Sequence, residues 1–154
     1  MTMTPNDFIN AISPAACQLA KSTKIPASFV VAQAALESGW AASQLAQRYF
    51  NLFGVKADSS WKGPTVMMPT TEYVAGKPTT VMARWRVYPD WLASLNDHAQ
   101  FLIVNPRYAA AFSYASGTTF ATAVAAAGYA TDPNYAAKII AIIKSHNLSA
   151  LDGD

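Results

Sequence analysis

Glu37 is the residue whose position most directly suggests chemistry. It is one of only two glutamates in the 154-residue sequence, the other being Glu72. It lies almost at the end of a nearly all-apolar stretch that reads I-P-A-S-F-V-V-A-Q-A-A-L-E-S-G-W (Ile25 to Trp40) and predicts a buried helix. Burial and the unpaired carbonyls of a helix C-terminus both favour a neutral carboxyl group, so its pKa should be raised. A carboxyl that keeps its proton near neutral pH suits a general acid. The alternative is a solvated Glu on the polar stripe of an amphipathic helix, but this stretch offers almost no such stripe.

A second carboxylate would complete a catalytic pair, because glycoside hydrolases usually place two acids across the bond that they cleave. Glu72 is the candidate, in T-T-E-Y-V-A-G (Thr70 to Gly76), close to the turn of a predicted hairpin. Alternation with a period of two places it on the strand face opposite Tyr73. A Glu on a strand is more often solvated than catalytic, so the hypothesis depends on its pairing with Glu37. The separation of the two carboxylates, which distinguishes retention from inversion, is left to the fold.

Aromatic residues are more numerous than a small helical core requires, with four tryptophans and seven tyrosines. Apolar faces of sugars can stack on such rings while Tyr and Trp donate hydrogen bonds. Packing is the alternative interpretation, and we favour it for Trp85 and Trp91. Trp40, three residues after Glu37, fits the core and a cleft wall equally well.

The predicted elements form one mainly helical domain with a small inserted β-hairpin. Thr4-Pro5-Asn6-Asp7 is typical of a helix start, and Gly39 is well placed to end the helix that carries Glu37. Helices are predicted over about 5–21, 26–38, 42–49, 91–104, 107–112, 120–127 and 133–146. Strands are predicted over about 66–74 and 79–88, joined by a loop at 75–78. The domain is expected to span residues 1–148, with its β-lobe at about 55–88 and a frayed tail at 149–154.

Composition and charge exclude several classes of protein. Hydrophobic residues make up 52% of the chain and charged residues 13%, which is typical of a folded globular domain. The net charge of +2 gives no argument for a nucleic-acid partner. Cys17 is the only cysteine, so no intrachain disulfide is possible, and its apolar neighbours favour a core thiol over a nucleophile. The sequence shows neither a signal-peptide pattern nor an apolar run long enough for a membrane span.

Other chemistries find no support in the sequence. His98 and His146 with one cysteine do not make a metal cluster, and Asp97-His98 is interpreted as structural. Ser38 in E-S-G-W is not a nucleophile elbow, and no calcium loop or phosphate-binding glycine loop is present. We therefore expect neither a metal nor a cofactor.

Five motifs occur in the order in which a known family has them. They are A-Q-A-A-L-E-S-G-W (Ala32 to Trp40), F-N-L-F-G-V-K (Phe50 to Lys56), W-K-G (Trp61 to Gly63), E-Y-V-A-G (Glu72 to Gly76) and G-Y-A-T-D-P-N-Y-A-A-K-I (Gly128 to Ile139). With these motifs the chain resembles the glucosaminidase domains of glycoside hydrolase family 73, including the peptidoglycan-cutting domain of flagellar rod-assembly proteins. The resemblance covers about residues 25–143. An E-S-G helix alone also occurs in goose-type lysozymes and lytic transglycosylases, so it is the set of five motifs that indicates this family. Ala41 and Phe50 stand where relatives usually have Gly and Tyr, and neither carries a proposed chemical group.

The resemblance implies a lysozyme-like fold of the α+β class, with a helical lobe, a small β-lobe and a glycan groove between them. By motif position Glu37 corresponds to the general acid, and Glu72 to a β-lobe acid that assists water attack or stabilises the charged transition state. Substrate assistance by the acetamido group of the sugar is the alternative to a role for Glu72. Tyr129 corresponds to the tyrosine that lines the site beside the acid. The residues expected to bind substrate are Trp40, Asn51, Phe53, Trp61 and Tyr73.

The expected function is that of an endo-β-N-acetylglucosaminidase, which hydrolyses the β-1,4 bond after N-acetylglucosamine in peptidoglycan, as a monomer without metal, cofactor or nucleic acid. A muramidase or lytic transglycosylase on the same fold is one alternative, and a non-catalytic wall-binding module is another. The expected place of action is the bacterial cell wall, in the periplasm or outside the cell. Without a signal peptide, the chain would reach it from the cytoplasm by another route, as a phage lysin or secreted effector would, or it would be an excised domain.

Overall fold

Helix α1 (Pro5–Thr23) begins at a capping box, as the sequence predicts. The hydroxyl of Thr4 accepts a hydrogen bond from the backbone N–H of Asp7, and the Asp7 carboxylate accepts one from the N–H of Thr4. The structure is a computed structural model that describes residues 3–153. Its other elements are α2 (Ala27–Ser38), α3 (Gln44–Arg48), β1 (Thr65–Val74), β2 (Lys77–Arg86), α4 (Trp91–Val104), the 3-10 helix η1 (Pro106–Ser113), α5 (Gly117–Ala126), α6 (Tyr135–Ser145) and the 3-10 helix η2 (Leu148–Asp152).

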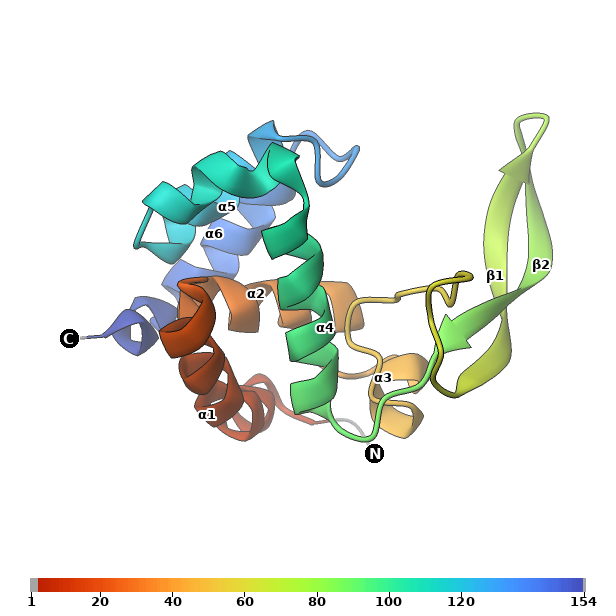
Figure 1. The fold of residues 1–154 in the computed structure, drawn as a ribbon, viewed down its shortest axis with the longest axis horizontal. Coiled ribbons are helices and arrows are strands. Elements are labelled where there is room, and N and C mark those ends of the chain that lie inside the picture. Colours follow the sequence, from red (N-terminus) through yellow and green to blue (C-terminus); the bar gives the residue numbers. More distant parts are fainter. Residues whose placement is uncertain (1–2, 154) are drawn as a thin grey trace.

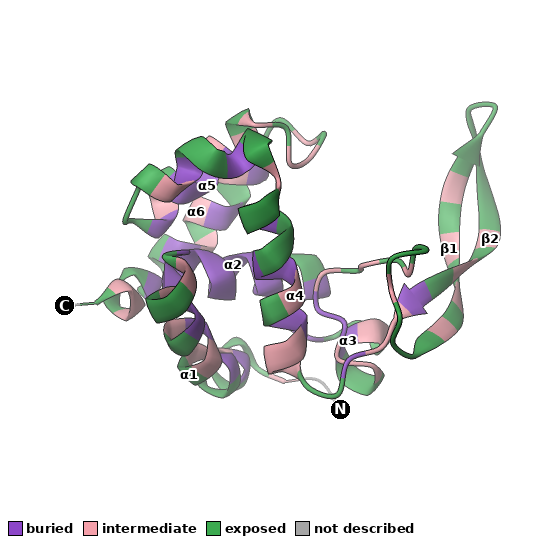
Figure 2. Ribbon diagram, in the orientation of Figure 1, coloured by how far each residue is buried: buried purple, intermediate pink, exposed green. Residues whose placement is uncertain are grey.

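Helix α2 lies at the centre of the helical body, with α1, α5, α6 and η2 packed against it (Figure 1). Every residue from Ala27 to Ala35 is buried, as Figure 2 shows by the purple colour of this helix. A helix that is apolar on all sides must be covered on all sides to remove its surface from water. Its burial therefore explains why the other helices gather around it.

Strands β1 and β2 form an antiparallel hairpin that extends away from the helical body (Figure 1). Ala75 and Gly76 both have positive φ, which is typical of the two-residue turns that match strand twist. Glu72 lies on the partly buried face of β1 and Tyr73 on the exposed face, as the alternation predicts. Pro69 lies within β1 because a two-stranded ribbon leaves one edge of each strand unpaired. The mainly helical α+β class with a small hairpin lobe is thereby confirmed.

Several of the predicted element boundaries were wrong. Helix α5 begins three residues earlier than predicted, at Gly117, because the Ser116 hydroxyl caps it by accepting from the N–H of Thr119. The last helix begins at Tyr135 rather than at Pro133, because the Asp132 carboxylate accepts a hydrogen bond from the N–H of Asn134 and forms a turn there. The loop predicted at 75–78 shortens to the two residues of the turn, because Lys77 and Pro78 pair with Val74 and Tyr73 as part of β2. The helix predicted at 107–112 is the 3-10 helix η1.

The prediction of a frayed tail was wrong for residues 149–152. These residues belong to η2, whose Leu148 is 2% exposed. The carboxylate of Asp152 accepts hydrogen bonds from the N–H and the hydroxyl of Ser28, at 2.9 and 2.6 Å, and from the N–H of Gly117 at 3.3 Å. Pro26, the residue before α2, has no capping side chain, so Asp152 satisfies donors at the N-termini of both α2 and α5. Residue 154 lies outside the described residues.

Gly117 lets α5 approach α2 closely enough for this arrangement. A Cβ atom at this position would lie 1.9 Å from the hydroxyl oxygen of Ser28 and 3.1 Å from the N atom of Phe29. The first distance is too short for any Cβ contact, so a side chain here would displace the Ser28 hydroxyl from Asp152. The absence of a side chain at Gly117 is thus required by the meeting of the two helix N-termini.

Replacing Asp152 with Ala should destabilise the domain. The substitution leaves the N–H groups of Ser28 and Gly117 without their acceptor, which costs about 1–3 kcal/mol in the free energy of unfolding. Urea unfolding of the Asp152→Ala variant measures this loss, with Ser149→Ala, on an exposed residue of the same 3-10 helix, as the matched control. Equal unfolding midpoints for the two variants would contradict the capping role.

Candidate active site

Glu37 lies in the last turn of α2, which Gly39 ends with a left-handed backbone conformation. This end of α2 faces the side of the body from which the hairpin extends (Figure 1). Glu37 is an exposed residue, but protein atoms around its carboxyl group partly desolvate it, and this desolvation raises its pKa above the ordinary value for Glu. The hydroxyl of Tyr135 donates a hydrogen bond to Glu37 Oε1 at 2.9 Å, which lowers the pKa in part. The expected direction of the shift is therefore present.

Tyr135, on the first turn of α6, is held by a buried amide. Gln33 lies one helical turn before Glu37, and its Nε2 lies 2.8 Å from the Tyr135 hydroxyl oxygen. The other end of the same amide, Oε1, lies 2.9 Å from Nε2 of His98 on α4. Three helices thus contribute one side chain each to a chain of hydrogen bonds that ends at Glu37. The sequence analysis missed this role for Gln33, although the i, i+4 spacing from Glu37 places both on one helix face.

Tyr129 lies beside this chain of hydrogen bonds. Its ring stacks on that of Tyr135 with the centroids 5.4 Å apart, and its hydroxyl lies 3.3 Å from His98 Nε2. Burial, with the nearby Glu37 charge, raises the pKa of the Tyr129 hydroxyl, which therefore stays protonated as a hydrogen-bond donor. The structure thus brings together two residues that the sequence analysis named separately, Glu37 and Tyr129.

A cleft of about 580 Å³ opens between α4 and the segment that precedes the hairpin. Phe53, His98 and Tyr129 line it together with Phe101, whose side chain is 46% exposed. Phe53, expected to bind substrate, stacks on His98 with the ring centroids 3.9 Å apart. Phe101 was missed by the sequence analysis because an apolar residue on an amphipathic helix carries no sign of facing a cleft. The combination of aromatic rings and polar groups in this cleft is suited to a carbohydrate.

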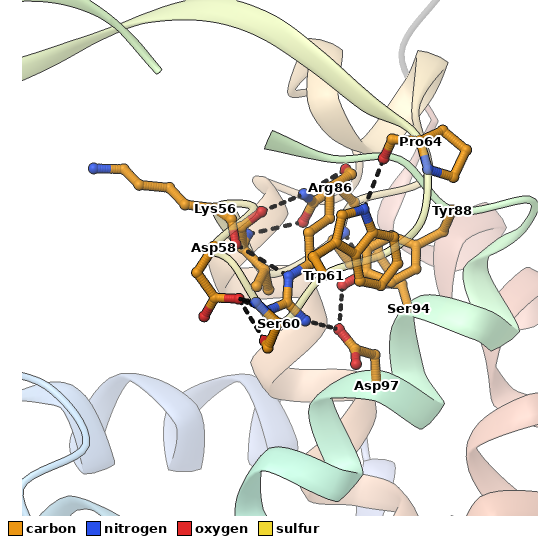
Figure 3. A network of polar contacts seen from close by, with 12 residues as sticks. Lys56, Asp58, Ser60, Trp61, Pro64, Arg86, Tyr88, Ser94 and Asp97 are labelled. Atoms are coloured by element: carbon orange, nitrogen blue, oxygen red, sulfur yellow. Dashed lines mark hydrogen bonds and ion pairs between the residues drawn. The ribbon is translucent and has the colours of Figure 1, made fainter. Parts of the chain in front are cut away.

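Arg86, at the end of β2, fastens the β-lobe to the helical lobe on the rim of this cleft (Figure 3). Its guanidinium donates to the carboxylate of Asp97 on α4 at 2.8 Å and to the backbone oxygen of Lys56 at 3.0 Å. It also lies over the ring of Trp61, 4.9 Å from the centroid. The Trp61 N–H donates to the backbone oxygen of Pro64. These contacts give Trp61 a part in holding the segment before β1.

Glu72 has a different environment from Glu37. It forms an ion pair with Lys56 at 2.7 Å, and both side chains are about half exposed. It pairs with Thr79 in the distal part of the hairpin, which in Figure 1 lies well away from the C-terminal end of α2. The structure therefore does not bring the two carboxylates together. An exposed ion pair contributes little to stability, so Glu72 is weakly held by Lys56.

The remaining expected substrate-binding residues have different surroundings. Trp40 packs edge-on against Phe8 and against His146, with ring centroids 5.9 and 4.9 Å away. Asn51 is buried and its side-chain amide bonds to the backbone of Val55 and Arg86, which holds the loop in place. Tyr73, at 76% exposed, stands near the tip of the hairpin. For Trp40 and Asn51 these contacts are those of packing and loop support.

Two features of residues 3–153 concern metal binding and membranes. Their His, Cys, Asp and Glu side chains form no group of three or more that could hold a metal ion. In the same part of the chain, no helix has both the length and the apolar character needed to cross a membrane.

Comparison with known proteins identifies the family. Residues 13–148 match the model of the glucosaminidase family, described as mannosyl-glycoprotein endo-beta-N-acetylglucosaminidase. The chain belongs to the glucosaminidase family. The expected membership in glycoside hydrolase family 73 is confirmed, and the chain is therefore a member of a family of glycoside hydrolases.

Two curated relatives of this glucosaminidase-family chain are a peptidoglycan hydrolase and an exo-glucosaminidase. The peptidoglycan hydrolase FlgJ of Salmonella typhimurium is 43% identical over 90% of this chain and 45% of its own length. The exo-glucosaminidase LytG of Bacillus subtilis is 38% identical over 94% of this chain and 52% of its own length. The chain thus spans about half the length of these relatives.

Solved structures agree with the family and with the expected lysozyme-like two-lobe fold. The glycoside hydrolase domain of Salmonella typhimurium FlgJ superposes with a TM-score of 0.82 at 40% identity, over 94% of this chain and 89% of that one. The catalytic domain of the autolysin Auto from Listeria monocytogenes gives a TM-score of 0.87 at 32% identity, over 98% and 90% of the two chains.

Removing the hydroxyl of Tyr135 should raise the pKa of Glu37 further. The hydroxyl donates its hydrogen bond preferentially to the ionised carboxylate, so the Tyr135→Phe variant loses an interaction that favours the charged form. Carbon-detected NMR titration of the Glu37 carboxyl measures the shift. Tyr73→Phe, at an exposed tyrosine on the hairpin, is the matched control, and a Glu37 pKa that falls or stays constant in Tyr135→Phe would contradict the assignment.

Proposed function

We propose that the chain is a peptidoglycan hydrolase that cleaves the β-1,4 bond after N-acetylglucosamine in cell-wall glycan strands. The observation that supports this most is the Glu37 carboxyl, which has a raised pKa and a hydrogen bond from Tyr135 in a glucosaminidase-family fold. Glu37 does not itself line the aromatic cleft, whose lining includes Tyr129. The names of FlgJ and LytG, a peptidoglycan hydrolase and an exo-glucosaminidase, agree with this substrate and bond.

In the proposed reaction, Glu37 is the general acid. Its carboxyl donates a proton to the glycosidic oxygen as the bond to the anomeric carbon breaks, and positive charge develops on the sugar ring. The raised pKa shifts Glu37 toward the protonated form that a general acid requires. The Tyr135 hydroxyl then stabilises the carboxylate that remains. The proton donor and the group that stabilises its conjugate base are thus already in contact.

Tyr129, Phe53 and Phe101 are proposed to bind the glycan in the cleft. The rings offer surfaces for the apolar faces of sugars, and the protonated Tyr129 hydroxyl offers a hydrogen bond close to the acid. Trp61 supports the same cleft through its contact with Arg86. Tyr73 stands at the exposed hairpin tip, where we propose that it meets the glycan strand beyond the cleft.

Glu72 is proposed to have a secondary role. Glu72 lies on the hairpin, where it pairs with Lys56 and not with Glu37. A carboxylate that acts as a direct nucleophile would lie about 5–5.5 Å from the acid. This arrangement supports attack by the acetamido group of the substrate or by water, with Glu72 acting on the developing charge from the β-lobe. We propose that the protein acts on the bacterial wall as a monomer, without a metal, a cofactor or a nucleic acid.

Removing the acid function of Glu37 should abolish most of the activity. For Glu37→Gln we expect a loss of about 10²- to 10⁴-fold in the release of fragments from purified cell walls, the usual contribution of a general acid. Glu72→Gln should lose less, because its carboxylate does not lie beside Glu37. Turbidity of wall suspensions measures both, with Asp7→Asn on α1 as the acid-to-amide control. Full activity in a folded Glu37→Gln variant would contradict the assignment, and wall binding without fragment release by the wild type would favour the non-catalytic module.

The nature of the new reducing ends should identify the cleaved bond. Cleavage after N-acetylglucosamine leaves this sugar at the reducing end, which mass spectrometry of borohydride-reduced fragments detects. The second candidate is a muramidase, because a probable N-acetylmuramidase of Lactococcus lactis is 38% identical over 99% of this chain. Muramic acid ends would favour that activity, and anhydro ends would favour a lytic transglycosylase.

A further inference from the structure

Gln33 and His98 are buried polar side chains whose contacts lead to Glu37 although neither touches it. Gln33 is 1% exposed and His98 is 8% exposed. They come from α2 and α4, and they meet Tyr135 of α6 in the interior of the helical body. Burying polar side chains carries a desolvation cost, so the arrangement of these two needs a physical explanation.

The direction of each hydrogen bond follows from the inventory of donors and acceptors. Once Glu37 has given up its proton, its carboxylate can only accept, so the hydroxyl of Tyr135 directs its hydrogen at Glu37 in that state. The oxygen of this hydroxyl must then accept a hydrogen from Gln33 Nε2, which assigns the orientation of the amide. Gln33 Oε1 consequently faces His98, and His98 Nε2 carries the hydrogen between them. Every hydrogen in the chain therefore points toward Glu37.

We propose that Gln33 and His98 are positioning residues that fix the Tyr135 hydroxyl as a donor to Glu37 and so orient the catalytic acid. This inference rests on the proposed role of Glu37 as the acid. His98 Nε2 also lies 3.3 Å from the hydroxyl of Tyr129, and because its one hydrogen is directed at Gln33, the Tyr129 oxygen can only share it as a second acceptor. One imidazole thereby links the acid to the wall of the cleft.

The surroundings of His98 keep the direction of these hydrogen bonds constant. The ring lies flat against Phe53, which holds its plane. Burial lowers the pKa of His98 to about 4, although the Asp97 charge beside it raises it in part, so the ring is neutral above that pH. Asp97 directs its carboxylate to Arg86 and Tyr88. Protonation would leave the hydrogen on Nε2 in place, so the direction of the chain is the same on both sides of the His98 pKa.

The titratable groups around the chain are few. The acid itself is Glu37. The groups that face it are Tyr135 of α6 and Tyr129 of the loop before α6. Asp97 acts on His98 from its own helix, and Tyr108 of η1 acts on Tyr129. Tyr129 and Tyr135, whose pKa values are raised by burial, and the neutral His98 act as donors or acceptors without a charge near neutral pH. Glu37 is therefore the group in this set whose protonation the chain controls.

The Gln33→Glu variant tests the direction of the hydrogen bonds. It preserves the size of the side chain, and in its ionised form it accepts at both ends, so the Tyr135 hydrogen turns from Glu37 to the introduced carboxylate. Because burial raises the pKa of such a carboxyl, the assay extends to alkaline pH. We expect kcat on cell-wall fragments to fall by up to about 10²-fold, as for a catalytic group displaced by about 1 Å, with KM unchanged. The alkaline limb of the kcat profile should move to higher pH, because Glu37 loses a donor and gains a negative neighbour.

Variants of His98 separate positioning from packing. His98→Phe keeps a ring against Phe53 but has no N–H donor, and it should lower kcat. His98→Gln retains an N–H donor and should recover part of the loss. Ile143→Ala, a core substitution two turns further along α6 from Tyr135, is the control for lost stability alone. If Ile143→Ala and Gln33→Glu lower kcat equally and neither variant moves the alkaline limb of the pH profile, the positioning role is overturned.

A spectroscopic measurement tests the inference independently of activity. Long-range ¹H–¹⁵N spectra of the wild-type protein at pH 6 should show His98 as a neutral ring with its hydrogen on Nε2. A neutral ring with its hydrogen on Nδ1 would overturn the proposed direction. If the wild type releases no wall fragments, the proposed function fails while this spectrum still decides the direction. If the wild type is active and Gln33→Glu retains its kcat, the inference fails and the proposed function stands.

Discussion

The burial of α2 is the constraint on which the rest of the structure depends. A helix with apolar residues on all sides is stable only when other helices remove its surface from water. The helices packed around α2 leave Glu37 at its C-terminal end and bury Gln33 one turn earlier. Asp152 completes the cover by satisfying donors at its N-terminus. The same packing that stabilises the domain thus positions the acid.

The polar chain in this core links stability to acidity. Among the described residues, no buried side-chain N or O atom lacks a hydrogen-bond partner, so the cost of burying Gln33 and His98 is offset by their mutual contacts. Because the pKa of Glu37 is raised on folding, its protonated carboxyl favours the folded state at low pH. That contribution is lost as the pH rises through the folded-state pKa. An acid suited to proton donation therefore lowers stability near neutral pH, as active-site groups commonly do.

The two lobes are joined differently from the helices. Within the body, contact is apolar and extensive, whereas Arg86 joins the β-lobe to α4 mainly through hydrogen bonds and an ion pair with Asp97. The hairpin beyond this point has little cover, as its green colour in Figure 2 shows. Glu72 lies on that uncovered part, and this placement explains why a pairing with Glu37 does not appear in the structure. The rigid part of the site belongs to the helical lobe.

The sequence by itself determined the local features. The apolar run around Glu37, the glycine that ends it and the alternating hairpin all depend on near neighbours, and five motifs in order were enough to indicate the family. Only the tertiary structure decided how Glu37 is supported. Tyr135 follows Gln33 by 102 positions and His98 follows it by 65, and Asp152 follows Ser28 by 124. Periodicity reports which face of a helix is apolar, but it does not report which distant polar groups meet there, because that depends on how the helices pack.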